Sequence, residues 1–232
     1  MPSDRWGEIS GLIDRCATSG SLPQGICQAG NELLGAESSA LTLSVDEGLL
    51  LIASSSDLAA QVVERQIILG EGPTIEAQEA MDPLVISSLR DAEIITRWPG
   101  FSKAARELKV QAAIAFPLRV GEIRVGVLTL VRSHVGVFSD VEYDDGLILV
   151  AVATEILLEH QASIEVDAVA EIFTRGLSST AQVQQAAGMV SEQLGISVTR
   201  ALALLRAHSY SEDLPLSRVA LLVLSRELRL EH

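Results

Sequence analysis

The sequence predicts an α+β domain followed by a smaller module made only of helices. In the first 160 residues, strand-like apolar runs come in pairs closed by short turns, and no β-α-β unit repeats. Such pairs indicate antiparallel hairpins. Roughly the last fifty residues show a helical period without any strand-like run. A chain of 232 residues has room for one domain of about 160 residues and one such module.

Residues 1–160 are expected to begin with two helices. Four apolar residues lie at helical spacing in the first one: Trp6, Ile9, Leu12 and Ile13. The second helix spans about 23–34, with Ile26 and Leu33 facing inward. Because apolar residues make up 48% of the chain and aromatic ones only 3%, the expected core consists of Leu, Ile, Val and Ala.

Two hairpins supply most of the expected sheet. Residues 39–45 and 49–53 are apolar runs joined by an Asp-Glu-Gly turn. Residues 111–120 and 124–132 form the second pair, which a Val-Gly-Glu-Ile turn closes. A further short strand is expected at 84–86.

Further helices lie between and after these strands. The pattern predicts helices at about 58–66 and 98–108, and a long helix that begins near Ser139, whose hydroxyl can cap the first turn. This order of elements predicts an antiparallel sheet with flanking helices rather than a doubly wound sheet.

Three short amphipathic helices are expected in the tail. Apolar residues at i, i+3, i+4, i+7 and i+11 mark the first helix: Val183, Ala186, Ala187, Val190 and Leu194. Gly195 is a natural left-handed C-cap after it, and Ser197 can cap the second helix. The Asp213-Leu214-Pro215 step starts the third helix, because proline is tolerated in a first turn.

Small residues are expected where these helices meet. Gly188, Ala201 and Ala220 would let the backbones approach closely. Since helices of about fifteen residues are marginal alone, the three helices are expected to bury their stripes against each other in one compact module.

Five short motifs follow one another in this module: Ala186-Ala187-Gly188, Gly195, Ala201, Leu205-Arg206 and Leu216-Ser217-Arg218-Val219-Ala220. Their order and spacing resemble the ANTAR domain, the RNA-binding output module of bacterial antitermination regulators, over roughly residues 165–229. This chain departs from the family pattern at two positions. Ala187 stands where the family's first helix has Lys or Thr, and Leu214 stands at a position before the third helix that is often basic. The resemblance implies a protein that binds RNA and is not an enzyme.

Five motifs also stand out in the first part: Leu69-Gly70-Glu71-Gly72-Pro73, Asp82-Pro83-Leu84-Val85, Ala115-Phe116-Pro117-Leu118, Gly126-Val127-Leu128-Thr129-Leu130 and Phe138-Ser139-Asp140-Val141-Glu142. They resemble the GAF domain over most of residues 7–160. GAF domains bind small molecules or dimerise; which of these applies, and which ligand or cofactor is bound, stays open. Together the two resemblances are to a GAF–ANTAR antitermination regulator of the actinobacterial type.

Charge limits how this chain could bind RNA. The net charge is −14, of which −12 lies in residues 1–164 and −2 in residues 165–232. Nucleic-acid binders usually carry a basic footprint, so RNA binding needs a few arginines on one face, doubled by a dimer axis. The alternative to RNA contact is a salt bridge to Glu212 for Arg206 and a solvated helix face for Arg200. No DNA partner is expected. The expected RNA contacts are Gln185, Arg200, Arg206, His208 and Arg218.

A helical linker over 161–178 is expected between the two parts. Val166, Val169 and Phe173 lie along one side of it and predict a short coiled-coil-like dimer seam. An intramolecular packing face is the alternative at each single residue, but the whole pattern favours a homodimer. The expected division is a sensor domain at 1–160, this linker, the helical module at 179–229, and a remnant at 230–232 that resembles the start of an expression tag.

The sequence shows no enzyme active site. Gly70-Glu71-Gly72 lacks the third glycine of a dinucleotide fingerprint, and the four histidines have no metal-ligand spacing. The paired carboxylates Asp144-Asp145 and Asp46-Glu47 are expected to be an exposed helix turn and a hairpin tip. His134 could ligate haem, but a solvated surface histidine is the favoured interpretation.

Compartment and redox chemistry follow from the cysteines and the apolar runs. Cys16 and Cys27 fit a reduced compartment, and unreactive helix residues are favoured over redox sensors. Both lie in the wrong region for the sulfoxide reduction that some GAF domains catalyse. The N-terminus lacks the layout of a secretory signal and no apolar run is as long as a membrane span, so a cytoplasmic protein without membrane contact is expected.

These patterns predict an RNA-binding regulator of transcription antitermination. Two ANTAR-like heads would hold paired hairpin loops in nascent mRNA under the control of the GAF-like sensor. Two rival interpretations stay open. The helical tail could dock another protein, which exposed Leu214, Leu216 or Leu221 would favour, or it could be a non-binding remnant on a small-molecule sensor.

Overall fold

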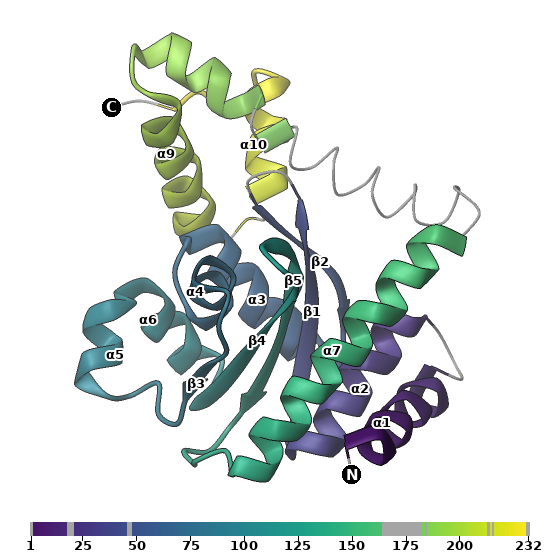
Figure 1. The fold of residues 1–232 in the computed structure, drawn as a ribbon. Coiled ribbons are helices and arrows are strands. Elements are labelled where there is room, and N and C mark those ends of the chain that lie inside the picture. Colours follow the sequence, from purple (N-terminus) through teal and green to yellow (C-terminus); the bar gives the residue numbers. More distant parts are fainter. Residues whose placement is uncertain are drawn as a thin grey trace. The chain divides into compact units, whose positions relative to one another are not determined.

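The computed structural model describes residues 2–17, 21–45, 48–163, 182–183, 185–212, 214 and 216–230. The chain divides into two compact units, Met1–Ile164 and Glu165–His232 (Figure 1). Apart from residues 161–163, the expected linker at 161–178 lies outside the described residues, together with Val166, Val169 and Phe173 of the expected dimer seam. Each unit is therefore described by itself.

The first unit is built on a five-stranded antiparallel sheet with the strand order β2-β1-β5-β4-β3. The strands are β1 (Ser38–Val45), β2 (Gly48–Ser54), β3 (Leu84–Ile86), β4 (Ala112–Val120) and β5 (Ile123–Arg132). Both expected hairpins, β1 with β2 and β4 with β5, are confirmed, and so is the short strand β3. Strand β5 also pairs with β1, with Leu128 opposite Leu41, which joins the two hairpins into one sheet.

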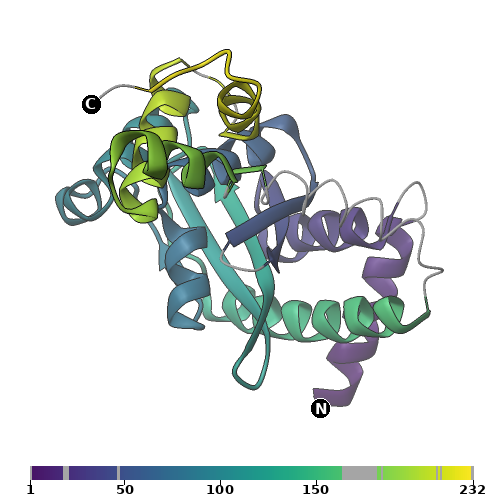
Figure 2. The ribbon, with the colours of Figure 1, turned by 90° about the horizontal axis from the view of Figure 1, so that it is seen from above.

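Helices cover both faces of this sheet (Figures 1 and 2). One layer contains α1 (Pro2–Cys16), α2 (Leu22–Leu34) and α7 (Asp140–Ser163). The other contains α3 (Asp57–Leu69), α4 (Pro73–Ala80), α5 (Ala92–Arg97) and α6 (Pro99–Glu107). Successive side chains of a strand point to opposite faces, and Ile114, Ala115 and Phe116 of β4 are all 0% exposed. The core therefore extends on both sides of the sheet, and the expected α+β class is confirmed for this unit.

Helices α4 and α5 are absent from the expectation based on sequence. Helix α4 begins at Pro73 directly after Gly72, a pair that is typical of a turn, although proline is also tolerated in a first helical turn. Its buried residues, Pro73, Thr74 and Ala77, form no stripe of large apolar side chains. Helix α5 buries only Ile94. Neither helix leaves a helical period in the apolar residues, which is why the pattern does not reveal them.

The start of α7 is tied to the end of α2 by one buried arginine. Ser139 caps α7 as expected: its hydroxyl accepts from the Glu142 N–H at 3.3 Å, and the Glu142 carboxylate accepts from the Ser139 N–H at 2.6 Å. Arg132, which is 5% exposed, donates to Glu142 at 2.5 Å, to the Gly35 carbonyl at 3.2 Å and to the Leu34 carbonyl. Its guanidinium thereby satisfies the last carbonyls of α2 and the first acid of α7 together.

Asp145 corrects the expectation of an exposed pair of acids. Asp144 is exposed, but Asp145 is buried and accepts hydrogen bonds from Arg5 at 2.8 and 2.5 Å. Arg5 lies on α1, far from α7 in sequence, and α1 packs against α7. The partner of Asp145 is therefore supplied by tertiary structure, which a local sequence pattern does not show.

In the second unit, three helical stretches surround one core: residues 185–194, α9 (Val198–Ser211) and α10 (Leu216–Leu224). The buried residues of this core are Ala186, Ala187, Val190, Ala201, Leu205, Val219, Ala220 and Val223. The expected caps between the first two stretches are confirmed. Gly195 has a φ of 63°, and the Ser197 hydroxyl accepts from the Arg200 N–H at 3.3 Å. Leu230 also packs against this core, although it was assigned to the remnant.

Gly188 does not have its expected packing role. It is exposed, and a Cβ added there would meet no atom within 4 Å. Ala186 and Ala187 take the buried side of the helix, and a turn of about 100° per residue then carries residue 188 to the solvent side. Ala201 and Ala220, the other two expected packing residues, are both 0% exposed.

Candidate functional site

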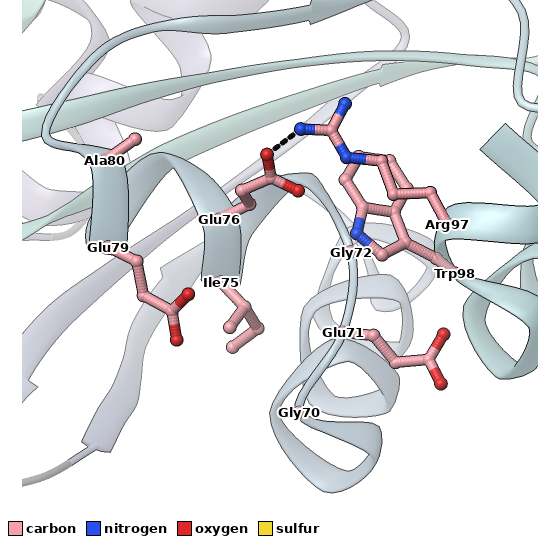
Figure 3. A pocket seen from close by; sticks show the side chains of 9 residues that line it. All are labelled: Gly70, Glu71, Gly72, Ile75, Glu76, Glu79, Ala80, Arg97 and Trp98. Carbon is pink, nitrogen blue, oxygen red and sulfur yellow. Dashed lines mark ion pairs between the residues drawn. The ribbon is translucent and has the colours of Figure 1, made fainter. Parts of the chain in front are cut away.

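An open groove of about 510 Å³ lies in the helical layer formed by α3 to α6 (Figure 3). Its walls come from the α3–α4 connection, from α4 and from the junction of α5 and α6. Gly70 and Gly72 turn the chain along one wall with φ values of 68° and 121°, which glycine adopts without strain. At Gly72 a side chain would also collide with Gln66.

Two charged residues of the groove form an ion pair next to a tryptophan. Arg97, at the end of α5, pairs with Glu76 of α4, and its guanidinium carbon lies 5.1 Å from the centre of the Trp98 ring (Figure 3). Trp98 is 4% exposed and meets the Phe101 ring edge to face at 6.4 Å, so it is a fixed platform. A guanidinium between a carboxylate and an aromatic face is held by two interactions, a charge-assisted ion pair and a cation–π contact.

Two further carboxylates line the groove. Glu71 accepts a hydrogen bond from the Phe101 N–H at 3.4 Å, in the first turn of α6, where helix N–H groups favour negative charge. The carboxylate of Glu79 has no hydrogen-bond or ion-pair partner among the residues that the structure describes. With Glu76 and Arg97, the groove carries three acidic groups and one basic group, which makes its charge negative.

Polar groups close the contact between α4 and the sheet. The hydroxyls of Thr74 and Thr129 lie 2.8 Å apart, and the Gln66 amide oxygen accepts from the Thr74 N–H at 2.7 Å. All three residues are at most 1% exposed. Because these polar groups hydrogen-bond to one another, α4 packs directly against β5. The groove lies on the side of α4 that faces α5 and α6.

The two cysteines are poorly suited to thiolate chemistry. Cys27 is buried, and its burial raises the pKa of the thiol to about 12. Partial burial of Cys16, together with the Glu32 carboxylate 3.8 Å from its sulfur, raises the pKa of that thiol too. Because the thiolate is the reactive form, these environments support the interpretation of both as unreactive helix residues.

The described ranges contain neither a candidate metal site nor a helix suited to crossing a membrane. His134 is a surface residue whose Nε2 lies 4.0 Å from a Glu37 carboxylate oxygen, in agreement with the solvated interpretation. No cluster of three or more His, Cys, Asp or Glu suited to a metal ion occurs within those ranges. No helix within them combines the length and apolarity needed to cross a membrane.

The expected RNA contacts of the second unit lie in different environments. Gln185, Arg200 and Arg218 are exposed, whereas Arg206 and His208 are half-buried. On α9, Arg206 comes six positions after Arg200, so the two side chains lie about 120° apart and do not share a face. The condition that RNA binding is expected to need, several arginines on one face, is therefore not met by Arg200 and Arg206 within α9.

Arg206 has an unusual state for a guanidinium. Its Nε atom is buried without a hydrogen-bond partner, and burial lowers the pKa of the side chain. The alternative Arg206–Glu212 salt bridge does not occur between these two described residues. An unpaired buried donor costs about 1–3 kcal/mol, so this position would gain from an acceptor.

The groove residues were not recognised from the sequence. Gly70-Glu71-Gly72 stands out in the sequence only as part of a GAF-like motif and as an incomplete dinucleotide fingerprint, and Trp98 only as the start of a helix. The adjacent pair Arg97-Trp98 was a weak signal for a cation next to an aromatic ring. Its carboxylate partner Glu76 lies on a helix that the pattern did not reveal, so the constellation could not be assembled from sequence.

Comparison with solved structures finds similar folds at low identity. The GAF domain of an Acinetobacter phosphoenolpyruvate-protein phosphotransferase matches with a TM-score of 0.50 and 16% identity, covering 72% of this chain and 98% of that one. The GAF domain of the Coxiella burnetii phosphotransferase matches with a TM-score of 0.51 and 15% identity, covering 70% and 98%. The free methionine-R-sulfoxide reductase of Neisseria meningitidis, solved with its substrate, matches with a TM-score of 0.50 and 13% identity, covering 70% and 91%.

Sequence-based comparison adds no closer relative. No protein-family model and no curated protein matches the chain. At identities of 13–16%, the structural matches show the fold alone. The sheet order, the flanking helices and these matches together establish that the first unit has the GAF-domain fold.

Proposed function

We propose that the chain is a cytoplasmic GAF–ANTAR regulator that binds RNA and controls transcription antitermination. The observation that carries this proposal is the state of the arginines in the second unit. Within the described part of that unit, none of the five arginines has an ion-pair partner: Arg200, Arg206, Arg218, Arg226 and Arg229. Cations that the fold does not use are available to phosphate groups.

The ANTAR-like motifs add a second line of support. Their alanines, Ala186, Ala187, Ala201 and Ala220, are the buried centre of the module, so the motif positions coincide with its core. Polar side chains on other sides, such as Gln185 and Arg218, are exposed. RNA loops are read by hydrogen bonds and stacking as well as by charge, which suits amide and guanidinium groups.

Arg206 is the strongest candidate for a direct RNA contact. Its Nε is already removed from water and lacks an acceptor, so the cost of dehydrating it is incurred in the folded module. A phosphate or base oxygen that reached this N–H would supply the missing acceptor. A charge-assisted hydrogen bond of this type is stronger than a neutral one.

The proposed mechanism is binding without covalent chemistry. Two modules of a homodimer hold two neighbouring hairpin loops of a nascent transcript, and RNA that adopts this fold is bound more tightly than the competing terminator fold. The population of RNA shifts towards the bound fold because the affinities for the two folds differ. The GAF unit controls the pairing of the modules.

Binding of the full chain to a two-hairpin RNA tests the proposal. A single hairpin and a two-hairpin RNA with scrambled loops are the controls, and light scattering gives the mass of the complex. We expect tight binding to the paired loops alone, with two chains in each complex. Equal affinity for all three RNAs would refute loop recognition, and a complex with one chain would refute the dimer.

Protein docking is the second candidate function. Leu221 of α10 is 40% exposed and Val198 at the start of α9 is 45% exposed, while Leu214 and Leu216 are half-buried. The separation of Arg200 and Arg206 around α9 also favours docking over a continuous basic face. The RNA titration separates the two, because a docking module should show no preference for paired loops.

The Neisseria meningitidis neighbour raises the question of sulfoxide reduction. We propose that this chain binds and does not catalyse, because the pKa of each thiol is raised and the thiolate form is disfavoured. Incubation with free methionine-R-sulfoxide and a dithiol reductant should form no methionine above the protein-free control. Methionine formation that Cys27→Ser abolishes would overturn this part of the proposal.

A further inference from the structure

Arg97 shows which chemical group the groove can hold. Its guanidinium lies beside the Trp98 ring and pairs with Glu76 across the groove (Figure 3). An aromatic face combined with a carboxylate is a recognition site for a guanidinium or an alkyl-ammonium group. The groove therefore contains a complete cation site that a side chain of the protein itself occupies.

The internal occupant is exchangeable, whereas the site around it is fixed. The side chains of Arg97 and Glu76 are 40% and 30% exposed, and an ion pair with this exposure adds little to stability. Trp98 is buried against Phe101 and does not depend on Arg97 for its position. A competing cation can thus replace Arg97 without disturbing the wall to which it binds.

The groove offers room and further charge beyond this pair. Its volume of about 510 Å³ lies within the range of about 300–1,000 Å³ that is usual for small-molecule sites. Figure 3 shows Glu79 one turn along α4 from Glu76, and its carboxylate has no partner among the described residues. A ligand with a second cationic group would find its partner there, with Ile75 and Ala80 on the same wall.

We propose that this groove binds a small organic cation, a molecule with a guanidinium or alkyl-ammonium group on an apolar stem, which displaces Arg97 from Trp98 and Glu76. The cationic group takes the place of the Arg97 guanidinium, and the stem lies along α4 towards Glu79. Release of Arg97 removes the ion pair that links the end of α5 to α4. This inference names the ligand class for the sensing part of the proposed function, on which it rests.

Calorimetric titration of the full chain with three related probes, in the absence of RNA, tests the ligand class. Agmatine carries a guanidinium and an ammonium group, arginine adds a carboxylate, and citrulline keeps the shape of arginine but replaces the guanidinium with a neutral ureido group. We expect agmatine and arginine to bind and citrulline to give no saturable heat. Equal binding of arginine and citrulline, or no binding of agmatine, would overturn the proposal.

Variants of the ion pair test the displacement. Arg97→Ala removes the internal competitor and should bind agmatine several-fold more tightly, whereas Glu76→Gln should bind it about ten-fold more weakly or worse. The matched controls are Arg90→Ala and Glu93→Gln, which change exposed charges near α5 outside the groove. Agmatine affinity should be unchanged in both controls, and circular dichroism verifies the fold of every variant.

The outcome of these titrations is independent of RNA binding. If Arg97→Ala leaves the affinity for agmatine unchanged or weakens it, Arg97 is no competitor and the displacement is refuted. If agmatine binds as expected but the chain shows no preference for paired hairpins, the ligand class stands and the antitermination proposal fails. If the chain prefers paired hairpins but does not bind agmatine, the antitermination proposal stands and the ligand class is refuted.

Discussion

Carboxylates hold three arginines of the first unit, whereas no ion pair holds a described arginine of the second unit. In the first unit, Arg5, Arg97 and Arg132 are each held by a carboxylate, and Arg132 is buried among backbone carbonyls as well. In the second unit, no described arginine forms an ion pair within the described part of the chain. Net charge alone, −12 against −2, conceals this difference. A weakly acidic module can still present free guanidinium groups if its fold needs none of them.

The largest expected effect is on the stability of the first unit. Arg132→Ala should lower its free energy of unfolding by about 3–5 kcal/mol, because the change leaves Glu142 and the last carbonyls of α2 without their donor. Urea denaturation followed by tryptophan fluorescence reports on this unit alone, since Trp6 and Trp98 are the only tryptophans.

The matched control for Arg132 lies in the second unit. Arg218 is exposed, and Arg218→Ala should change the stability of that unit, followed by helical circular dichroism, by no more than about 0.5 kcal/mol. If Arg132→Ala is as well tolerated as Arg218→Ala, the arginines of the two units are not used differently and the comparison fails.

The next effect concerns RNA affinity. Arg206→Ala should weaken binding to a two-hairpin RNA by about 1–3 kcal/mol, because it removes a donor that lacks an acceptor in the free protein. Filter binding or fluorescence anisotropy at fixed salt measures the change. Unfolding of the free module should not become easier, since no partner is left unsatisfied. A stability loss with unchanged RNA affinity would mark Arg206 as a structural residue.

Helical glycines extend the comparison from charge to packing. Gly146 lies in α7, and a Cβ there would collide with the Phe116 ring. Gly146→Ala should therefore lower the stability of the first unit by about 1–3 kcal/mol through overpacking. Urea denaturation measures the loss. An additional Phe116→Leu substitution should recover part of it, and a double variant no more stable than Gly146→Ala would contradict this contact.

Acid titration should show a smaller, pH-dependent difference. Burial acts to raise the pKa of Glu142, but hydrogen bonds from Ser139 and the Arg132 guanidinium outweigh it, and the pKa is lowered. A carboxylate with a lowered pKa stabilises the fold above its ordinary pKa, and this stabilisation is lost as the pH falls through the lowered value. Glu142→Gln should therefore be less stable than the wild type at neutral pH, and their unfolding free energies should converge in acid. A gap that stays constant with pH would contradict the lowered pKa.

What the sequence predicts well is what neighbouring residues decide. The hairpins β1–β2 and β4–β5 and the caps at Gly195 and Ser197 depend on contacts or backbone preferences within a few residues, and all were found as expected. Helix α4 was missed because its buried side consists of Pro73, Thr74 and Ala77, which give no apolar period.

What the sequence conceals is set by tertiary partners. Asp145 is buried because α1 brings Arg5 to it, and the groove depends on Glu76 and Arg97 from two helices that the pattern does not show. In the second unit, the motif located the core alanines correctly. It also assigned Gly188 to that core, because the motif gives residue type and spacing but not the side of the helix that is covered.

The smallest expected effect is at Gly188, and its sign is opposite to that at Gly146. Gly188 lies inside a helix with open space where a Cβ would be, so Gly188→Ala loses no contact and reduces the conformational freedom of the unfolded chain. We expect the second unit to gain about 0.5–1 kcal/mol, measured by thermal unfolding of its helical signal. Gly195→Ala is the matched control and should lose stability, because Gly195 has a φ of 63° with equally open space around it. A loss at Gly188 would mean that this face of the helix is covered.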